Sequence, residues 1–223
     1  MNDLNFKILK GEKVGIVGGS GNGKTTIISL LLGLYSVDNG EILINGTNIQ
    51  NININSLREN IGIVSQDIVI FEDTIRYNLD LKGEFKDEEL FEVLKAVDLI
   101  DVISNLPQGL DTLIDGTSYN LSGGQMQRLM IAKMILKKPE FIILDEATSA
   151  LDFKTEKSIL KYLTSFSDNT TLLIISHRLK AIEACDKVLV LDEHKIVAEG
   201  THNELLKCSK IYSKLFGGDC DEN

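Results

Sequence analysis

The stretch Gly18-Gly19-Ser20-Gly21-Asn22-Gly23-Lys24-Thr25 lies between an apolar run, Val14 to Val17, and a segment of helical pattern that starts at Thr26. Glycine, four residues and then Gly-Lys-Ser/Thr, placed between a strand and a helix, is the pattern of a phosphate-binding loop. Its glycines let backbone N–H groups turn toward an anion, and the amino end of the helix adds positive potential. The stretch predicts an α/β nucleotide-binding fold, in which Lys24 meets the outer phosphates and Thr25 offers a hydroxyl to magnesium.

Two carboxylates, Asp145 and Glu146, follow a second apolar run, Phe141 to Leu144. A short run of this kind predicts a strand that is buried on both faces of a parallel sheet. Ligands of open α/β sheets bind at the carboxyl ends of the strands, so we expect Asp145 to hold magnesium and Glu146 to polarise the attacking water. Alternatively, the glycine loop is an ordinary turn and the Asp-Glu pair begins a loop or caps a helix. The order of the two motifs favours the nucleotide site.

Between these motifs stands Leu121-Ser122-Gly123-Gly124-Gln125, and with it the chain resembles the ATP-binding cassette (ABC) family. The run is similar to the signature motif of that family, and its place between the other two motifs separates the family from other phosphate-loop ATPases. Further similar segments follow in the family's order: Val64-Ser65-Gln66-Asp67, Ser149-Ala150-Leu151-Asp152 and Ser176-His177-Arg178-Leu179. The segments from Ser56 to Asn78 and from Glu199 to Leu205 resemble the exporter branch.

The resemblance covers almost the whole chain and implies its fold and function. It implies one ABC ATP-binding domain over residues 1–223, a phosphate-loop NTPase core with a mixed sheet, and an α-helical subdomain inserted at residues 68–128. It also implies an enzyme that binds ATP and Mg²⁺ and hydrolyses ATP to power export through transmembrane domains, which are fused to it or separate. In this family two copies dimerise head to tail, so that the signature of one faces the phosphate loop of the other.

The resemblance also implies the role of each candidate site residue. Glu146 and His177 are expected to be catalytic, with His177 reading the outer phosphate, and Gln66 is expected to reach the magnesium ion or the water and to couple that contact to the membrane partner. The expected magnesium ligands are Thr25, Gln66 and Asp145. The expected nucleotide contacts are Gly18, Gly19, Ser20, Gly21, Asn22, Gly23, Lys24, Thr25 and Thr26, with Ser122, Gly123, Gly124, Gln125 and Asp152 acting across the dimer interface. A helix N-cap is the structural alternative for Asp152.

Composition excludes several classes of function. The net charge of -10 disfavours a nucleic-acid surface, which needs a basic stripe. No apolar run approaches the length of about 18 residues that spans a bilayer, and the chain does not start with a signal-peptide pattern. These features predict a soluble domain, and the resemblance implies that it lies at the cytoplasmic face of the membrane. Three cysteines without metal-like spacing, Cys185, Cys208 and Cys220, are interpreted as packing or surface residues, and His194 and His202 as residues outside the site.

Apolar periodicity predicts the positions of the main elements. Asn51 to Asn55 alternates Asn and Ile, and remains ambiguous between an edge strand and a loop. Helices are expected over residues 26–34, 87–97, 125–136 and 153–163. Strands are expected over residues 13–17, 41–44, 61–64, 141–144, 171–176, 187–191 and 195–198.

Two segments depart from the family pattern. Family members stack an aromatic residue on adenine well before the phosphate loop, whereas this sequence begins at Met1 and its Phe6 aligns with a core residue. This predicts that the chain is a fragment of a fused transporter, with a separately encoded subunit as the alternative. Exporters also carry a Gly-Glu-x-Gly pattern where this chain has Asp115 to Asn120.

Other functions fit the sequence less well than ATP-driven export. Chromosome-organising and DNA-repair relatives need a long coiled coil, for which the stretch between Lys24 and Leu121 leaves no room. An ATP-dependent regulatory clamp without turnover is disfavoured by the intact Glu146 and His177. A non-transport ABC ATPase stays as the alternative function. The sequence determines neither the transported substrate nor whether the dimer contains identical chains, because specificity resides in membrane segments.

Overall fold

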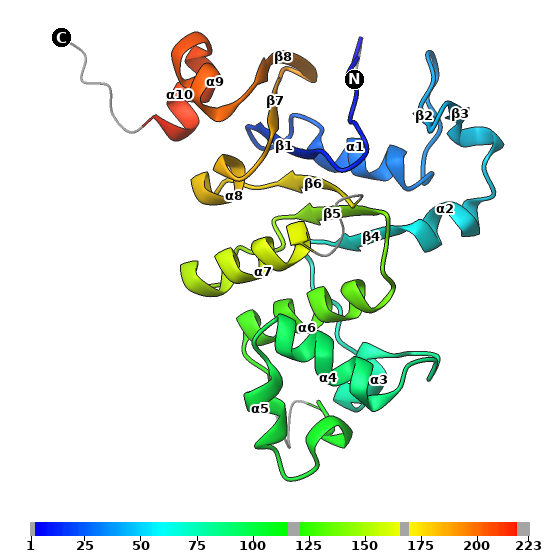
Figure 1. The fold of residues 1–223 in the computed structure, drawn as a ribbon. Helices are drawn as coiled ribbons and strands as arrows, with labels where there is room; N and C mark the ends of the chain where they lie inside the picture. The colour runs from blue at the N-terminus through cyan, green and yellow to red at the C-terminus, as the bar shows by residue number, and fades with distance from the viewer. Residues whose placement is uncertain (1–2, 116–120, 166–169, 218–223) are drawn as a thin grey trace.

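A six-stranded sheet in the order β4-β5-β6-β1-β7-β8 forms the centre of the structure (Figure 1). The structure is a computed structural model, and it describes residues 3–115, 121–165 and 170–217. In this sheet neighbouring strands from β4 to β7 run parallel, and β8 pairs with β7 in the antiparallel direction. The strands are β1 (Lys13–Gly18), β4 (Ile61–Val64), β5 (Phe141–Asp145), β6 (Thr171–Ile175), β7 (Lys187–Asp192) and β8 (Lys195–Gly200). The expected α/β fold with a mixed sheet is confirmed.

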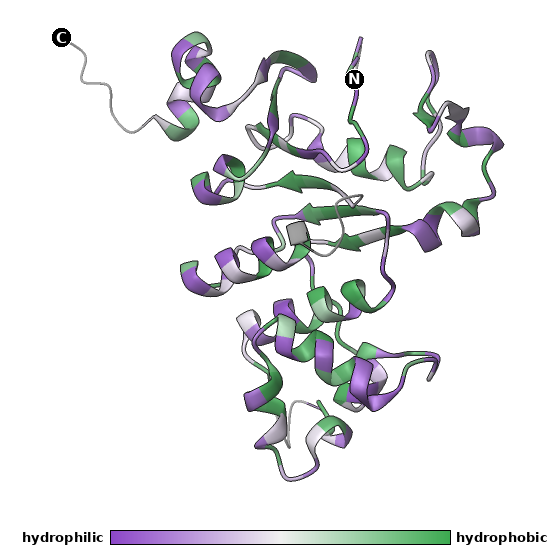
Figure 2. Cartoon of the chain, in the orientation of Figure 1, coloured by the Kyte–Doolittle hydropathy of each residue, from purple (hydrophilic) through white to green (hydrophobic). Residues whose placement is uncertain are grey.

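The central strands are buried because helices cover both faces of the sheet. All five residues of β6 are buried, and hydrophobic residues run along β5 and β6 in Figure 2. On one face Ile16 and Leu173 pack with residues of α1 (Lys24–Leu31) and α2 (Ile54–Asn60). On the other face Val17 and Ile174 belong to the cluster that contains α6 (Gly123–Leu136), α7 (Phe153–Ser165) and α8 (Leu179–Glu183). Polar side chains are therefore left to the ends of the strands.

The segment between β4 and β5 is helical. Within its described residues, 65–115 and 121–140, the only β-pairing is an isolated bridge between Thr74 and Leu113. Figure 1 shows these helices as a lobe on one side of the sheet, to which α6 extends. They are α3 (Ile75–Leu79), α4 (Asp87–Ala96), α5 (Ile100–Ser104), the 3-10 turn η2 (Gly109–Asp111) and α6. Gly116 to Asn120, the rest of the segment that departs from the exporter pattern, lie outside the described residues.

The ambiguous stretch from Asn51 to Asn55 is neither an edge strand nor a loop throughout. It spans the end of the 3-10 turn η1 (Ile49–Asn51) and the start of α2. The side chain of Asn53 accepts hydrogen bonds from the N–H groups of Asn55 and Ser56, and so caps α2. A small hairpin of β2 (Leu43–Ile44) and β3 (Thr47–Asn48) precedes it. Its turn, Asn45-Gly46, has positive φ at both residues, as a two-residue hairpin requires.

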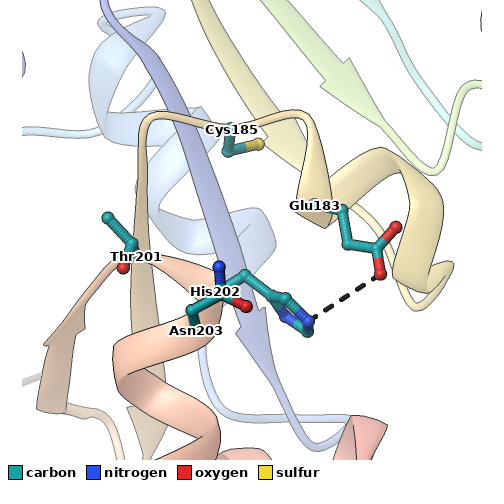
Figure 3. A pocket seen from close by; sticks show the side chains of 5 residues that line it. All are labelled: Glu183, Cys185, Thr201, His202 and Asn203. Atoms are coloured by element: carbon teal, nitrogen blue, oxygen red, sulfur yellow. Dashed lines mark ion pairs between the residues drawn. The ribbon is translucent and has the colours of Figure 1, made fainter.

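The chain's last helices, α9 (His202–Cys208) and α10 (Lys210–Phe216), pack near the start of β7. A hollow of about 420 Å³ there is lined by Glu183, Cys185, Thr201, His202 and Asn203 (Figure 3). His202 lies 2.8 Å from the Tyr212 hydroxyl through Nδ1 and 3.8 Å from Glu183 Oε1 through Nε2. These contacts give His202 a structural role at the sheet edge opposite the phosphate loop.

Two of the three cysteines fall within the described residues. Cys185 is buried and Cys208 is exposed, and neither is in a disulfide; Cys220 lies outside the described part of the chain. Among the helices that the structure describes, none combines the length and the apolar character needed to cross a bilayer.

Candidate nucleotide site

The loop between β1 and α1 is held against the end of β7. A Cβ added to Gly18 would stand 2.3 Å from the Leu191 carbonyl oxygen, so only glycine allows this approach of the two strands. The Asn22 side-chain amide donates to the Leu191 carbonyl at 3.1 Å. Gly21 and Gly23 have φ of 80° and 96°, a left-handed conformation that glycine adopts without a steric penalty. The glycines and Asn22 therefore shape the loop, as the motif predicts.

Lys24 is the first residue of α1, and its side chain reaches back to the loop. Its Nζ donates to the carbonyl oxygens of Gly18 at 2.6 Å and Gly19 at 3.0 Å. Burial lowers the pKa of Lys24, while the charges of Glu146 and Asp145 act in the opposite direction. The Lys24 amine thus lies near both carboxylates that the sequence singled out. Thr25 and Thr26 follow it in the first turn of α1 with exposed side chains.

Asp145 is the last residue of β5 and lies in a negatively charged environment. Burial raises its pKa, the charges of Glu146 and Asp67 raise it further, and Lys24 opposes them. The sequence predicted no role for Asp67 beyond its place in the Gln66 segment. Its position three residues beyond the end of β4 could have indicated that it lies near Asp145. A cation bound at this edge would offset the repulsion between these carboxylates.

Gln66 follows β4, and β4 is the neighbour of β5, the strand that ends at Asp145. Gln66 is exposed, and Val64 of β4 pairs with Leu144 immediately before Asp145. Thr25, Gln66 and Asp145 offer a hydroxyl, an amide oxygen and a carboxylate, which are the hard oxygen donors that Mg²⁺ prefers. Among the described residues no group of three His, Cys, Asp or Glu side chains suits a metal ion. Magnesium bound with nucleotide phosphates needs only one or two carboxylates, so this donor set fits it.

Glu146 and His177 meet at the ends of the neighbouring strands β5 and β6. His177 Nε2 lies 3.3 Å from Glu146 Oε1. Glu146 has a left-handed backbone with φ of 51°, and its N–H donates to the Ile175 carbonyl at 2.9 Å. The side chain of His177 is 51% exposed, so it faces the surface where a ligand could bind. The structure therefore brings together the two residues that the resemblance named as catalytic.

The signature motif forms the amino end of α6. Ser122 Oγ accepts from the Gln125 N–H at 3.3 Å, and Gln125 Oε1 accepts from the Ser122 N–H at 2.8 Å, which makes a capping box. Ser122 and Gly123 are exposed, whereas a Cβ on Gly124 would stand 2.9 Å from the Ala150 carbonyl oxygen. Within one chain the side chain of Gln125 thus stabilises the helix end, and Ser122 and Gly123 remain accessible.

Asp152 has the structural role that the sequence left as an alternative. Its Oδ1 accepts from the N–H groups of Lys154 at 3.0 Å and Thr155 at 3.1 Å, and its Oδ2 accepts from the Thr155 hydroxyl at 2.7 Å. Asp152 therefore caps the amino end of α7. It is also exposed, so a contact with a second chain is compatible with the cap.

Gln127 is a site residue that the sequence pattern did not reveal. It is 1% exposed, and its side chain bonds the segment that follows β5. Nε2 donates to the Glu146 carbonyl at 3.3 Å, and Oε1 accepts from the Ala150 N–H at 3.0 Å. The signal was a glutamine on the same helical face as the buried Ile131 and Ile135, four and eight residues later.

Comparisons with known proteins show the family of the chain. The sequence model of the ABC transporter family matches residues 1–149, and the model of a P-loop domain matches residues 86–214. The chain belongs to the ABC transporter family. Within this family it is an ATPase domain of the exporter type, as the sequence predicted, and the family is one that binds ATP.

Similar proteins occur in bacteria. A putative multidrug export ATP-binding/permease protein of Staphylococcus aureus (strain bovine RF122 / ET3-1) is 45% identical over 217 residues, 97% of this chain and 38% of that protein. An uncharacterized ABC transporter ATP-binding protein of Bacillus subtilis (strain 168) is 42% identical over 216 residues, 96% of this chain and 38% of that protein.

Among solved structures, a bacterial Atm1-family ABC exporter with ATP bound superposes with a TM-score of 0.91 at 39% identity. That match covers 98% of this chain and 39% of the exporter chain. The chain thus spans about two fifths of the length of these relatives.

Proposed function

We propose that this ABC ATPase domain, residues 1–223 with a helical subdomain at residues 68–128, acts as a head-to-tail pair around ATP and Mg²⁺. In this proposal ATP hydrolysis powers export through transmembrane domains, with the chain at the cytoplasmic face of the membrane. Its similarity to a putative multidrug export ATP-binding/permease protein and to an Atm1-family exporter supports the link to a membrane partner. The single observation that carries the proposal is the Glu146–His177 pair at 3.3 Å, beside the loop that contains Lys24.

The phosphate loop binds the triphosphate in this mechanism. Lys24 supplies a cation whose present partners are the carbonyl oxygens of Gly18 and Gly19, and phosphate oxygens would compete for the same amine. Thr25, Asp145 and Gln66 are the proposed magnesium ligands. When bound, magnesium neutralises charge on the outer phosphates. A cation held by these residues would also offset the repulsion of Asp145 by Glu146 and Asp67.

Glu146 and His177 are proposed to act on the reacting groups. Phosphoryl transfer depends mainly on positioning and charge stabilisation, so a carboxylate that orients water has a large effect on the rate. The Glu146 carboxylate accepts a hydrogen bond from the attacking water, and His177 donates from Nε2 toward the outer phosphate. Their separation of 3.3 Å lets one hydrogen-bonded network contain both side chains.

The exposed amino end of α6 completes the site of the second chain in this proposal. Ser122, Gly123 and Gly124 would bind the outer phosphate of the partner's ATP, and the positive end of the 14-residue helix α6 favours that anion. Gln125 fixes the loop by capping, and Asp152 would stand at the interface near the opposite phosphate loop. The two sites are thereby incomplete until two chains meet.

The proposal is tested by phosphate release from Mg-ATP with the purified chain and the Glu146→Gln variant. The amide keeps the shape of the side chain but lacks the negative charge, so turnover should fall by roughly 10²- to 10⁴-fold while nucleotide binding persists. Glu41→Gln, a change at an exposed glutamate away from the site, is the matched control and should hydrolyse ATP like the wild type. Near-normal hydrolysis by Glu146→Gln would refute the assigned role. Nucleotide binding without phosphate release by the wild type would instead indicate a regulatory clamp.

A further inference from the structure

Glu156, in the first turn of α7, is a buried charged residue outside the phosphate loop and its magnesium donors. Its side chain is 4% exposed. Oε1 accepts from the Thr148 hydroxyl at 2.5 Å, and Oε2 accepts from Arg178 Nη1 at 2.9 Å. Both carboxylate oxygens therefore have a partner, and these partners belong to two different loops.

The two partners of Glu156 adjoin the two catalytic side chains. Thr148 follows Glu146 by two residues, and Arg178 directly follows His177. The backbone N–H of Arg178 also donates to Ser176 Oγ at 3.0 Å, which fixes the turn that contains His177. One carboxylate from the helix that connects β5 to β6 thus joins the loops at the ends of both strands.

Fold stability does not account for a charged residue at this place. Removing an ion pair from water costs several kcal/mol per ion, and apolar residues of similar volume often stabilise a fold equally well or better. Arg178 is 37% exposed, so the pair is buried mainly on the Glu156 side. The carboxylate instead fixes the two loops relative to each other, because it accepts one hydrogen bond from each of them.

We propose that Glu156 is a positioning residue. By accepting hydrogen bonds from Thr148 and Arg178, it fixes the positions of Glu146 and His177 relative to each other, so that both side chains can act on the same phosphate. This inference rests on the proposed ATP hydrolysis and adds a residue to it. Displacement of a catalytic group by about 1 Å can cost about 10²-fold in rate. Loss of the Glu156 bridge should therefore lower kcat and leave nucleotide affinity nearly unchanged, because the bridge joins Thr148 to Arg178 and not to Lys24 or the phosphate loop.

The test compares Glu156→Gln, Thr148→Val and the double variant in steady-state hydrolysis and in equilibrium binding of ATP with magnesium chelated. Each rate is expressed per folded molecule, measured by circular dichroism and thermal unfolding. Glu156→Gln should lower kcat about 10- to 100-fold, and Thr148→Val, which removes a single hydroxyl, about 3- to 10-fold. The double variant should be no slower than Glu156→Gln, because both changes break the same bridge. Glu156→Asp should recover part of the rate.

Glu12→Gln is the matched control. Glu12 Oε1 pairs with Lys187 Nζ at 3.3 Å, also with little exposure, but at the amino ends of the strands and far from the site. This variant should lose stability without a change in kcat. A folded Glu156→Gln or Thr148→Val with wild-type kcat would overturn the inference, as would equal losses of kcat in Glu12→Gln. Absence of hydrolysis in the wild type would instead refute the proposed function.

Discussion

Glu146 is held in a backbone conformation that a residue with a side chain rarely adopts. Its φ of 51° lies in the left-handed region, where a non-glycine residue costs of order 1–3 kcal/mol. Three hydrogen bonds offset this cost: its N–H donates to Ile175, and its carbonyl accepts from Ser149 and from the side chain of Gln127. Gln127 thus helps to fix the backbone that directs the carboxylate of Glu146, the proposed catalytic residue.

Replacing Gln127 tests this contribution. Gln127→Leu keeps the volume but leaves the Ala150 N–H without its acceptor, and an unsatisfied buried donor costs about 1–3 kcal/mol. We expect the free energy of unfolding in urea to fall by this amount, and kcat to fall more than nucleotide affinity. Gln108→Leu, at an exposed glutamine, should change stability by less than about 0.5 kcal/mol. Equal stability of the two variants would contradict the role of Gln127.

The packing between β1, β7 and α8 shows how elements constrain one another. Gly15 of β1 leaves room for neighbouring side chains, since a Cβ there would stand 3.1 Å from Ile182 and 3.2 Å from the Cys185 sulfur. Cys185 donates from Sγ to the Ala181 carbonyl, and it lines the hollow beside α9 (Figure 3). Burial raises the pKa of Cys185 to about 12 from an ordinary value of 9.0. The folded protein therefore favours the neutral thiol.

This raised pKa predicts a pH-dependent difference in stability. The contribution of the neutral thiol is complete below pH 9.0 and is lost as the pH rises toward about 12. Cys185→Ala should be less stable than the wild type by about 1 kcal/mol at pH 7.5, and this difference should shrink or reverse at pH 10.5. Urea unfolding of both proteins under reducing conditions measures it, and Tyr212, whose pKa is also raised to about 12, titrates in both. Parallel stability profiles over this pH range would disprove the assignment.

The whole molecule presents two surfaces that the proposed function uses. The phosphate loop, Asp145, Glu146 and His177 gather at the carboxyl ends of the parallel strands, whereas Ser122 and Gly123 are exposed at the start of α6. Gly124 and Gln127 on α6 contact the segment from Glu146 to Ala150, so the helix that begins at one surface packs directly against the other. In the proposed dimer each chain therefore connects its own ATP site to that of its partner.

Ser122→Arg separates nucleotide binding from pairing of chains. In a Glu146→Gln background, ATP should produce a dimer, and adding Ser122→Arg should prevent it while single-chain binding of ATP persists. Ser122→Ala controls for loss of the cap, which costs about 1 kcal/mol without adding bulk.

Lys24→Ala should behave differently and weaken nucleotide binding itself by at least roughly tenfold, or 1.4 kcal/mol. Light scattering and nucleotide titration measure both properties, and equal loss of single-chain affinity in Ser122→Arg and Lys24→Ala would argue against the two-chain site.

Local sequence determined where most strands lie, because a strand depends on residues only a few positions apart. The strand at Ile61–Val64 has the bounds that its apolar run predicted, and most other strands differ by one or two residues at an end. The expected strand over residues 41–44 is only Leu43–Ile44. Neither alternative for Asn51 to Asn55 holds throughout, because Asn53 caps a helix that starts at Ile54. Capping depends on which residue turns its side chain back on the backbone, and alternating Asn and Ile resembles a strand pattern.

The sequence alone determined the family, the α/β fold and the motifs at the nucleotide site, because phosphate binding requires glycines, a lysine and carboxylates at fixed short spacings. Only the tertiary structure decided which distant residues meet. It brought His177 to 3.3 Å from Glu146, joined Thr148 to Arg178 through Glu156, and set Gln127 against the carbonyl of Glu146. Such contacts depend on strand order and helix packing, and single buried polar residues on apolar faces reveal their partners only when the chain has folded.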